Sequence, residues 1–462
     1  MVVSMKNKLS VIMGGILGFI GILIGTSLVI TYPILIKEFN VSLSNVQWLS
    51  SGYYLVATLV MSTTAYLMKT LPLKRIFQIA SIIFIVGSLI AANAHVFWLL
   101  LVGCMLDAFA TGLATPLMYQ IVFHSIPVVE FGFYTGIVTM IKSFGPAFGP
   151  TYGGVLTHLW TWRLIFIGVI PLVIIALLVG NYALSLNKPI PQTKSFDFSG
   201  LLIFALMLLA FTWAINQAGK YHFVSINFGS FLIIGIILLV IFIYHLNHTQ
   251  REYLNFSVLK NNLICIRGIS FFNLQFVNLS LAFLLPLFAE ETLHLNAMDA
   301  GLLLLPGALV GAIISPLAGK MYDHKGAFMT LMLANIFLLV GVGIYCILTA
   351  HLTALLLGSV YLIFRLGYTF SFGNTLSDAS NHVAKNNRSD ISSLFNTFQQ
   401  SAGSLGNSLM ATIISLYEMK YTNAANAVMH GSHFGLLILV VIVMINIIIT
   451  IIAKQTNHQR VN

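Results

Sequence analysis

Apolar stretches of about 20 or more residues, separated by short polar breaks, fill this chain from one end to the other. A helix of about 20 residues crosses the roughly 30 Å hydrocarbon core of a bilayer and satisfies its own backbone hydrogen bonds there. The pattern therefore predicts an all-α integral membrane protein with about fourteen transmembrane helices. They are expected near residues 9–36, 46–68, 76–94, 97–123, 132–157, 164–186, 199–217, 227–247, 264–289, 299–322, 326–349, 352–377, 389–417 and 432–453.

Lysine and arginine fall mostly on one side of this predicted topology. Of the 22 basic residues, sixteen share the side of the N-terminus, and only Lys37, Arg163, Lys220 and Lys420 lie on the other side. Because basic loops are retained in the cytoplasm, both termini are expected to be cytoplasmic. One missed or extra span would scramble this asymmetry, so fourteen spans fit better than twelve. The net charge of +10 is then explained by the anionic cytoplasmic leaflet, without nucleic acid as a partner.

The longer polar breaks predict how the chain divides. A break with two prolines at 187–198 follows the sixth span, and others lie at 248–262 and 378–390. We expect a six-helix bundle at 1–186, a linker with two extra transmembrane helices at 187–262, and a second six-helix bundle at 263–462. Basic turns at 65–75 and 319–326 occupy corresponding places in the two halves. Internal repeats of this kind are typical of transporters.

Composition argues against an enzyme. The 13 histidines and 3 cysteines show no metal-ligand spacing, and the chain has no catalytic constellation or glycine-rich nucleotide loop. No cofactor and no metal are therefore expected. With 58% apolar and 7% charged residues, any charge inside a span stands out.

Three charged residues, Asp107, Lys142 and Arg365, lie inside predicted spans. Each costs a few kcal/mol or more at mid-bilayer, so each is a candidate functional residue. Asp107 and Lys142 lie on neighbouring antiparallel spans, at heights that differ by about 9 Å. Either Asp107 binds a proton or a cationic substrate that Lys142 displaces, or the two residues form a permanent structural pair.

Arg365 has three possible roles. In the first, its side chain reaches the cytoplasmic interface. In the second, it forms an ion pair with Asp378, about three to four turns away. In the third, it lines a cavity and attracts an anionic group of a substrate. Aromatic and amide side chains in the second and ninth spans are candidates for the surface of such a cavity, with packing or interfacial anchoring as the alternative. They are Trp48, Tyr53, Tyr54, Asn273, Gln275 and Asn278.

The fifth span contains Gly145-Pro-Ala-Phe-Gly-Pro-Thr-Tyr-Gly-Gly154. These residues match the antiporter motif G-P-x-x-G-P-x-x-G-G, and the chain resembles the fourteen-span drug:proton antiporters of the major facilitator superfamily. Glycines at helical spacing allow close helix packing, while Pro146 and Pro150 remove backbone donors and kink or soften the helix. The resemblance implies a monomer in the lipid bilayer that uses the proton motive force to move small molecules by alternating access.

Further motifs extend the resemblance over the chain. Gly319-x-x-x-Asp323-x-x-Gly326 is similar to the loop signature of the superfamily, in which the acid caps a helix or pairs with a basic residue and so latches one conformation. Segments 160–171 and 300–316 resemble the sixth and tenth spans. Asn396-Thr-Phe-Gln-Gln400 resembles the thirteenth span and adds Asn396 and Gln400 to the cavity candidates.

Departures from the family pattern concern the residues that would carry protons. Lys69 stands where the first loop signature usually has Asp, and the usual acid of the first span is replaced by Ile24. In the fourth span the usual Arg is missing, and Asp107 occupies the position of a Gln. Asp107 is therefore the expected proton-coupling residue, with Lys142 as its partner.

These observations predict proton-coupled efflux of amphipathic or cationic drugs, which would confer antibiotic resistance, from a bacterial plasma membrane. One alternative is a monovalent-cation or metal–tetracycline antiporter, which would call for more embedded acids. Another is an exporter of an anionic lipid, fatty acid or metabolite, favoured by Lys142 and Arg365. A different class is a membrane sensor or scaffold that does not transport.

Overall fold

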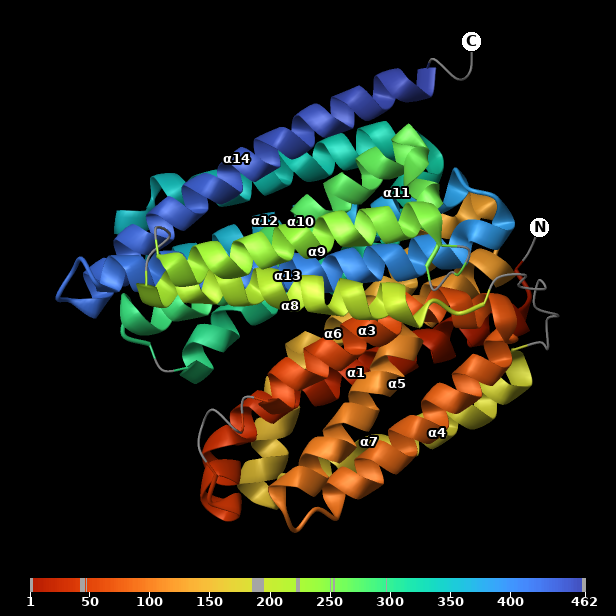
Figure 1. Ribbon diagram of the computed structural model, residues 1–462, viewed down its shortest axis with the longest axis horizontal. Coiled ribbons are helices and arrows are strands. Elements are labelled where there is room, and N and C mark those ends of the chain that lie inside the picture. The colour runs from red at the N-terminus through yellow and green to blue at the C-terminus, as the bar shows by residue number, and fades with distance from the viewer. Residues whose placement is uncertain are drawn as a thin grey trace. The chain divides into compact units, whose positions relative to one another are not determined.

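Helices make up the described chain. The computed structural model describes residues 3–41, 46, 48–184, 195–221, 225–249, 251, 254–295 and 297–458. No strand occurs among these residues, which confirms the predicted all-α class. The long helices are α1 (Met5–Phe39), α3 (Trp48–Thr70), α4 (Leu73–Ala92), α5 (Phe97–Ser125), α6 (Phe131–Leu159), α7 (Leu164–Ala183), α8 (Phe198–Tyr221), α9 (Ile226–His248), α10 (Asn262–Glu291), α11 (Ala297–Ile347), α12 (Ala354–Asn381), α13 (Arg388–Glu418) and α14 (Ala424–His458) (Figure 1).

Short 3-10 turns connect some of these helices. They are η1 (Val128–Glu130), η2 (Phe256–Lys260), η3 (Thr349–His351) and η4 (Lys385–Asn387). The 51 residues of α11 form two helices that meet at a kink at Gly326, whose φ of 77° lies in the left-handed region that glycine adopts without strain. Within the described residues, 10 helices are long and apolar enough to cross a membrane by length and composition. The count of fourteen spans stays a prediction.

The helices fall into two compact units, which we describe separately. Unit 1 comprises Met1–Thr193 together with two short segments, Ser315–Asp323 of α11 and Val383–Thr397 at the start of α13. Within it α1 packs against α5, α6 and α7, α4 packs against α5 and α7, and α3 packs against α5.

Unit 2 comprises Lys194–Ile314, His324–His382 and Phe398–Asn462. Helices α8 and α9, which correspond to the two predicted extra spans, pack against each other, and α10 packs against α12 and α14. Residues 187–194 of the predicted linker lie outside the described residues. The predicted boundaries at 186 and 262 therefore stay predictions.

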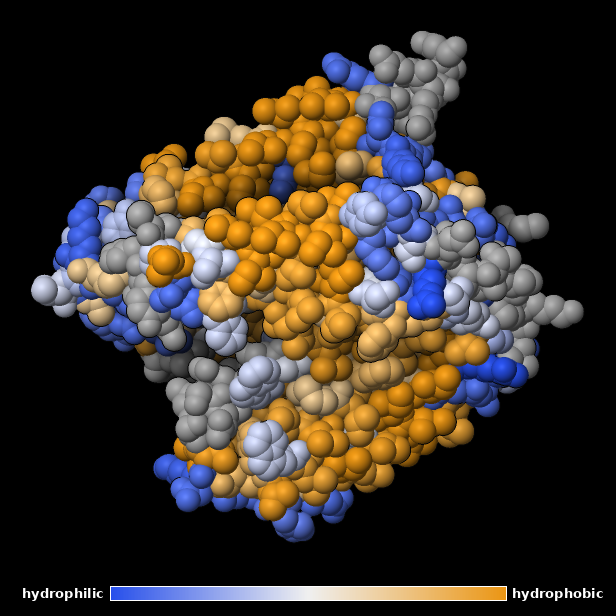
Figure 2. All heavy atoms as spheres, in the orientation of Figure 1, coloured by the Kyte–Doolittle hydropathy of each residue, from blue (hydrophilic) through white to orange (hydrophobic). Residues whose placement is uncertain are grey.

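Apolar side chains cover the outward faces of several helices. On α9 the exposed residues include Ile233, Ile236, Ile237, Val240 and Ile243. Figure 2 shows apolar side chains along the length of α8 and α9, with polar residues gathered toward helix ends. This distribution suits helices whose middle sections face lipid.

Candidate functional site

Asp107 lies at the contact between α4 and α5 and is completely buried, with 0% of its surface exposed. The Ser88 hydroxyl lies 3.3 Å from both carboxylate oxygens, Oδ1 and Oδ2, and donates to the carboxylate. A Cβ atom on Gly87 would lie 2.6 Å from Oδ1, so the carboxylate fits against α4 because residue 87 has no side chain. The packing leaves space for a proton here but not for a drug-sized molecule.

A hydroxyl network continues from Asp107 to α3 and α1. Thr111 donates to the backbone carbonyl of Asp107 at 2.8 Å, and the Tyr53 hydroxyl lies 2.6 Å from Thr111 Oγ1. The Tyr53 hydroxyl lies 2.7 Å from the Gly21 carbonyl as well, so its single proton is shared between this carbonyl and Thr111 Oγ1. Tyr53, predicted as cavity surface, is thus buried in the packed interior of unit 1.

Lys142 lies elsewhere in unit 1. Its side chain on α6 is 7% exposed, and its ammonium is 5.9 Å from the centre of the Tyr119 ring on α5. At 1.5 Å per residue, Tyr119 is about 18 Å further along α5 than Asp107. The structure therefore does not bring Asp107 and Lys142 together, because the carboxylate meets Ser88 of α4 while the ammonium lies by Tyr119.

The antiporter motif forms the contact between α6 and α1. Cβ atoms on Gly145, Gly149 and Gly153 would meet Ile22, Thr26 and Ser27 of α1, respectively. The Ser27 hydroxyl donates to the Gly149 carbonyl at 2.8 Å. Gly154 is half-buried, Pro146 is exposed, and the side chain of Pro150 lies outside the described residues. Helix α6 continues through the motif, and the glycines of the motif allow α6 to pack closely against α1.

Asp323 caps the start of α6. The backbone N–H groups of Gly132 and Phe133 donate to its two carboxylate oxygens at 2.9 and 2.8 Å. The N–H groups in the first turn of a helix have no partner within the helix, and a carboxylate is favourable at this positive end. Gly319 lies against the Gly132 backbone. Of the two roles considered for Asp323, the structure shows the helix cap.

The first loop signature makes a different contact, one that the sequence did not reveal. The Lys69 ammonium lies 2.7 Å from Oδ2 of Asp390, a buried residue in the first turn of α13. In the sequence, Asp390 falls where the polar break 378–390 meets the start of the predicted span 389–417, and nothing there points to this partner.

In unit 2 the structure brings together several of the predicted cavity residues. The Nη1 group of Arg365 on α12 donates to Oδ1 of Asn278 on α10 at 3.1 Å. The guanidinium stacks over the Tyr368 ring at 4.6 Å, and the Tyr368 hydroxyl lies 3.4 Å from the amide of Gln275. We call Arg365, Asn278, Tyr368 and Gln275 the Arg365 cluster.

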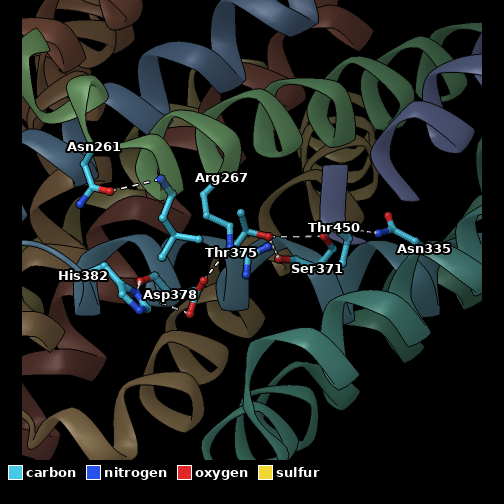
Figure 3. Close-up of polar contacts among 9 residues, drawn as sticks. Asn261, Arg267, Asn335, Ser371, Thr375, Asp378, His382 and Thr450 are labelled. Carbon is cyan, nitrogen blue, oxygen red and sulfur yellow. Dashed lines mark hydrogen bonds and ion pairs between the residues drawn. The ribbon is translucent and has the colours of Figure 1, made fainter. Parts of the chain in front are cut away.

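Asp378 pairs with another arginine. The Arg267 Nε donates to Oδ2 of Asp378 at 2.6 Å, and both side chains are buried (Figure 3). His382, one turn later, places Nδ1 3.8 Å from the other carboxylate oxygen. Of the three roles considered for Arg365, pairing with Asp378 is therefore wrong.

The remaining cavity candidates are scattered along their helices. Trp48 and Tyr54 on α3 are 56% and 49% exposed, and Asn273 on α10 is half-buried. On α13, Asn396 is buried and donates to the Ser392 carbonyl at 2.7 Å, while Gln400 is half-buried.

A groove of about 490 Å³ lies at the first turns of α11 and α12 in unit 2. Its lining is apolar except for Asp299 and Ser359, and it contains none of the predicted site residues. Within the described part of the chain, no group of three or more His, Cys, Asp or Glu side chains is arranged to hold a metal ion.

Sequence reasoning missed Tyr368 and Ser88. Tyr368 follows Arg365 by three residues, a spacing that places both on one helix face, so the pair was detectable. Gln275 and Asn278 share the same spacing on α10. Ser88 carries no such signal, because its role depends on how α4 packs against α5.

Comparison with known proteins identifies the class to which this architecture belongs. The family model for the Major Facilitator Superfamily matches residues 14–407, and the chain therefore belongs to this family of transporters. It is 29% identical over 419 residues to a lincomycin resistance protein, LmrB, of Listeria innocua, covering 89% of this chain and 87% of that protein. It is 26% identical over 468 residues to the riboflavin transporter RibZ of Clostridioides difficile, covering 99% and 100%.

A solved structure with a similar fold is the proton:xylose symporter XylE. The TM-score is 0.66 at 12% identity, over 97% of this chain and 95% of that one. The chain is thus a membrane transporter rather than an enzyme, as its composition predicted.

Proposed function

We propose that this chain exports small amphipathic molecules across a bacterial cell membrane in exchange for protons. Membership of the Major Facilitator Superfamily and the similarity to a lincomycin resistance protein support export of a small molecule. Relatives of comparable similarity carry names for lincomycin and for riboflavin, so the names alone do not select a substrate.

The observation that carries the proposal of proton coupling is the position of Asp107. Its carboxylate is fully buried in unit 1, and its hydrogen-bond partner is the neutral hydroxyl of Ser88. Such a group exchanges a proton when its surroundings alternate between dry and hydrated states, because burial and hydration favour different protonation states. Because the packing excludes a larger ligand, the proposal assigns Asp107 to the proton rather than to a cationic drug.

Asp107 takes up one proton from the outside in this proposal and releases it to the cytoplasm as the transporter returns. Lys142, on α6, lies beside Tyr119 of α5 and is too far from Asp107 to displace that proton by direct contact. We propose further that both termini lie in the cytoplasm, in keeping with the distribution of the basic residues, and that the protein works as a monomer.

Transport in reconstituted vesicles tests the proposal. Purified protein in liposomes, with an imposed pH gradient, should accumulate an amphipathic dye against its concentration gradient. Collapse of the gradient with a protonophore should release the dye. If neither dye nor protons move with cationic, neutral or anionic amphipathic dyes, the non-transporting sensor or scaffold becomes the better account.

A further inference from the structure

Arg365 is a buried cation for which the described residues provide no acid. Its side chain is 8% exposed, and no described Asp or Glu forms an ion pair with it. Asp378, the acid closest to it in the sequence of α12, is engaged by Arg267 at 2.6 Å. Keeping a charge in a membrane-spanning segment without a counter-ion is costly, and such charges usually mark a path for a substrate or an ion.

The contacts of Arg365 fix the guanidinium but leave one edge of it available. Asn278 accepts from Nη1, and the Tyr368 ring supports the flat face of the group. Nε is buried and has no hydrogen-bond partner among the residues that the structure describes. Nε and Nη2 together form the edge that a carboxylate accepts with two parallel hydrogen bonds.

Neighbouring residues keep this arrangement in place. The Tyr368 hydroxyl lies 3.4 Å from the Gln275 amide, which holds the ring under the guanidinium. On α11, a Cβ atom at Gly311 would lie 3.5 Å from Nε, so the glycine leaves the flank of this donor without a side chain. The cluster is therefore an ordered donor site.

We propose that the Arg365 cluster binds the acidic group of the transported molecule, and that the substrates are amphipathic organic anions. This inference rests on the proposed function and adds the substrate class to it. Arg365 makes the contact with the anion, while Asn278, Tyr368 and Gln275 are positioning residues.

An acid introduced next to Arg365 should distinguish an anion-binding arginine from a purely structural one. Asn278→Asp places a carboxylate where the amide oxygen now accepts from Nη1. For a structural arginine this change supplies the missing ion pair and leaves ligand binding alone. For an anion site it occupies the guanidinium and repels the ligand.

Two dyes with the same xanthene scaffold and opposite charge test the proposal. Binding of carboxyfluorescein and of tetramethylrhodamine methyl ester to the purified full chain is followed by fluorescence anisotropy. The wild type should bind the anionic dye at least about tenfold more tightly, as expected for a charge-assisted hydrogen-bonded pair. Arg365→Gln and Asn278→Asp should each weaken carboxyfluorescein binding by about tenfold or more. Lys420→Gln, an exposed residue, controls for the loss of one positive charge.

Two further measurements test the role of the guanidinium and exclude misfolding as the cause of weaker binding. Arg365→Lys keeps the charge but not the two-donor edge, so it should retain part of the preference for the anion. Asn278→Asp should unfold at a temperature equal to or above that of the wild type, so its weaker binding would not reflect misfolding.

The anion proposal is overturned if the wild type fails to bind carboxyfluorescein, or if Arg365→Gln and Asn278→Asp bind it within about twofold of the wild type. Proton-coupled transport of the cationic dye would in that case leave the proposed export function standing. Absence of all dye and proton movement would instead contradict the export function itself.

Discussion

The Lys69 ammonium and the Asp390 carboxylate form an ion pair 2.7 Å apart, with the acid fully buried. The family resemblance leads one to expect Asp at the position of Lys69. In the corresponding later loop, Asp323 does what such an acid can do and caps the start of α6. At the start of α13 the acid belongs to the helix itself, and Lys69, in the last turn of α3, supplies the base. The first signature therefore also contributes a charged group to the start of a helix, but the group is the Lys69 cation and its partner is an acid of that helix.

Removing the charge of Lys69 should destabilise the protein. Lys69→Met leaves Asp390 buried without this cation, and loss of one partner of a buried pair costs about 3 kcal/mol. The thermal unfolding temperature of the purified protein should fall. The double variant with Lys69→Asp and Asp390→Lys should recover part of the loss, because the pair is restored but a cation at a helix N-terminus is unfavourable by about 0.5 kcal/mol. Additive losses in the double variant would count against the pair.

The contact between α1 and α6 should be sensitive to a single methyl group. Gly149→Ala would drive a Cβ atom into Thr26. Overpacking of this kind costs about 1–3 kcal/mol, so the unfolding temperature should drop. Adding Thr26→Ala should recover part of that loss. Gly343→Ala is the control, because no heavy atom lies within 4 Å of the added group. Equal effects at 149 and 343 would contradict the packing role.

The Arg267–Asp378 pair should matter more than the neighbouring histidine. Asp378→Asn weakens a buried ion pair and should destabilise the protein by about 3 kcal/mol. His382→Gln removes a partner 3.8 Å from the carboxylate and about one-third exposed, and should cost less than about 1 kcal/mol. Thermal unfolding of both variants in the same detergent gives the comparison. A His382 variant as unstable as the Asp378 variant would argue against this assignment.

Asp197, which lies just before the start of α8, should make the stability of the protein depend on pH. Burial raises the pKa of Asp197, but hydrogen bonds from Gly200 N–H, Ser199 and His245 hold the pKa below its ordinary value. A lowered pKa in the folded state means that the ionised carboxylate stabilises the fold above the unfolded pKa of about 3.9. That contribution is lost as the pH falls through the folded pKa.

Asp197→Asn should therefore lower the unfolding temperature at pH values above about 5 and have a smaller effect near pH 3. Ser225→Ala is the control, because it removes the N-cap of α9 without an ionisable group. Its effect, about 1 kcal/mol, should not change over the same range. An Asp197→Asn effect that is equally independent of pH would contradict the assignment.

The all-α class was readable from the sequence because every span must carry its own apolar length. Individual contacts were harder to read. Arg365, Asn278 and Gln275 were recognised as candidates, since polar groups inside spans stand out, but the stacking of Arg365 on Tyr368 was not foreseen. Asp107 and Lys142 show the limit of the reasoning. Their heights along two helices were estimated, whereas the directions of their side chains depend on which helix each face packs against.

Lys69 shows that a contact can also be missed when neither residue stands out in the sequence. A basic residue in a polar break looks like an ordinary topology signal, and its partner Asp390 lies more than 300 residues later. Contacts between such distant segments depend on tertiary packing, which no local pattern encodes.

Proton movement through Asp107 is the central claim, and the pH inside reconstituted vesicles measures it directly. Addition of a transported dye to wild-type vesicles loaded with a pH indicator should change the internal pH in the direction expected for exchange of dye and proton. Asp107→Asn should abolish that change while the protein inserts and unfolds like the wild type. Ser88→Ala, which removes the hydroxyl but keeps the acid, should retain it. Dye-driven proton movement at the wild-type rate in Asp107→Asn would contradict the account.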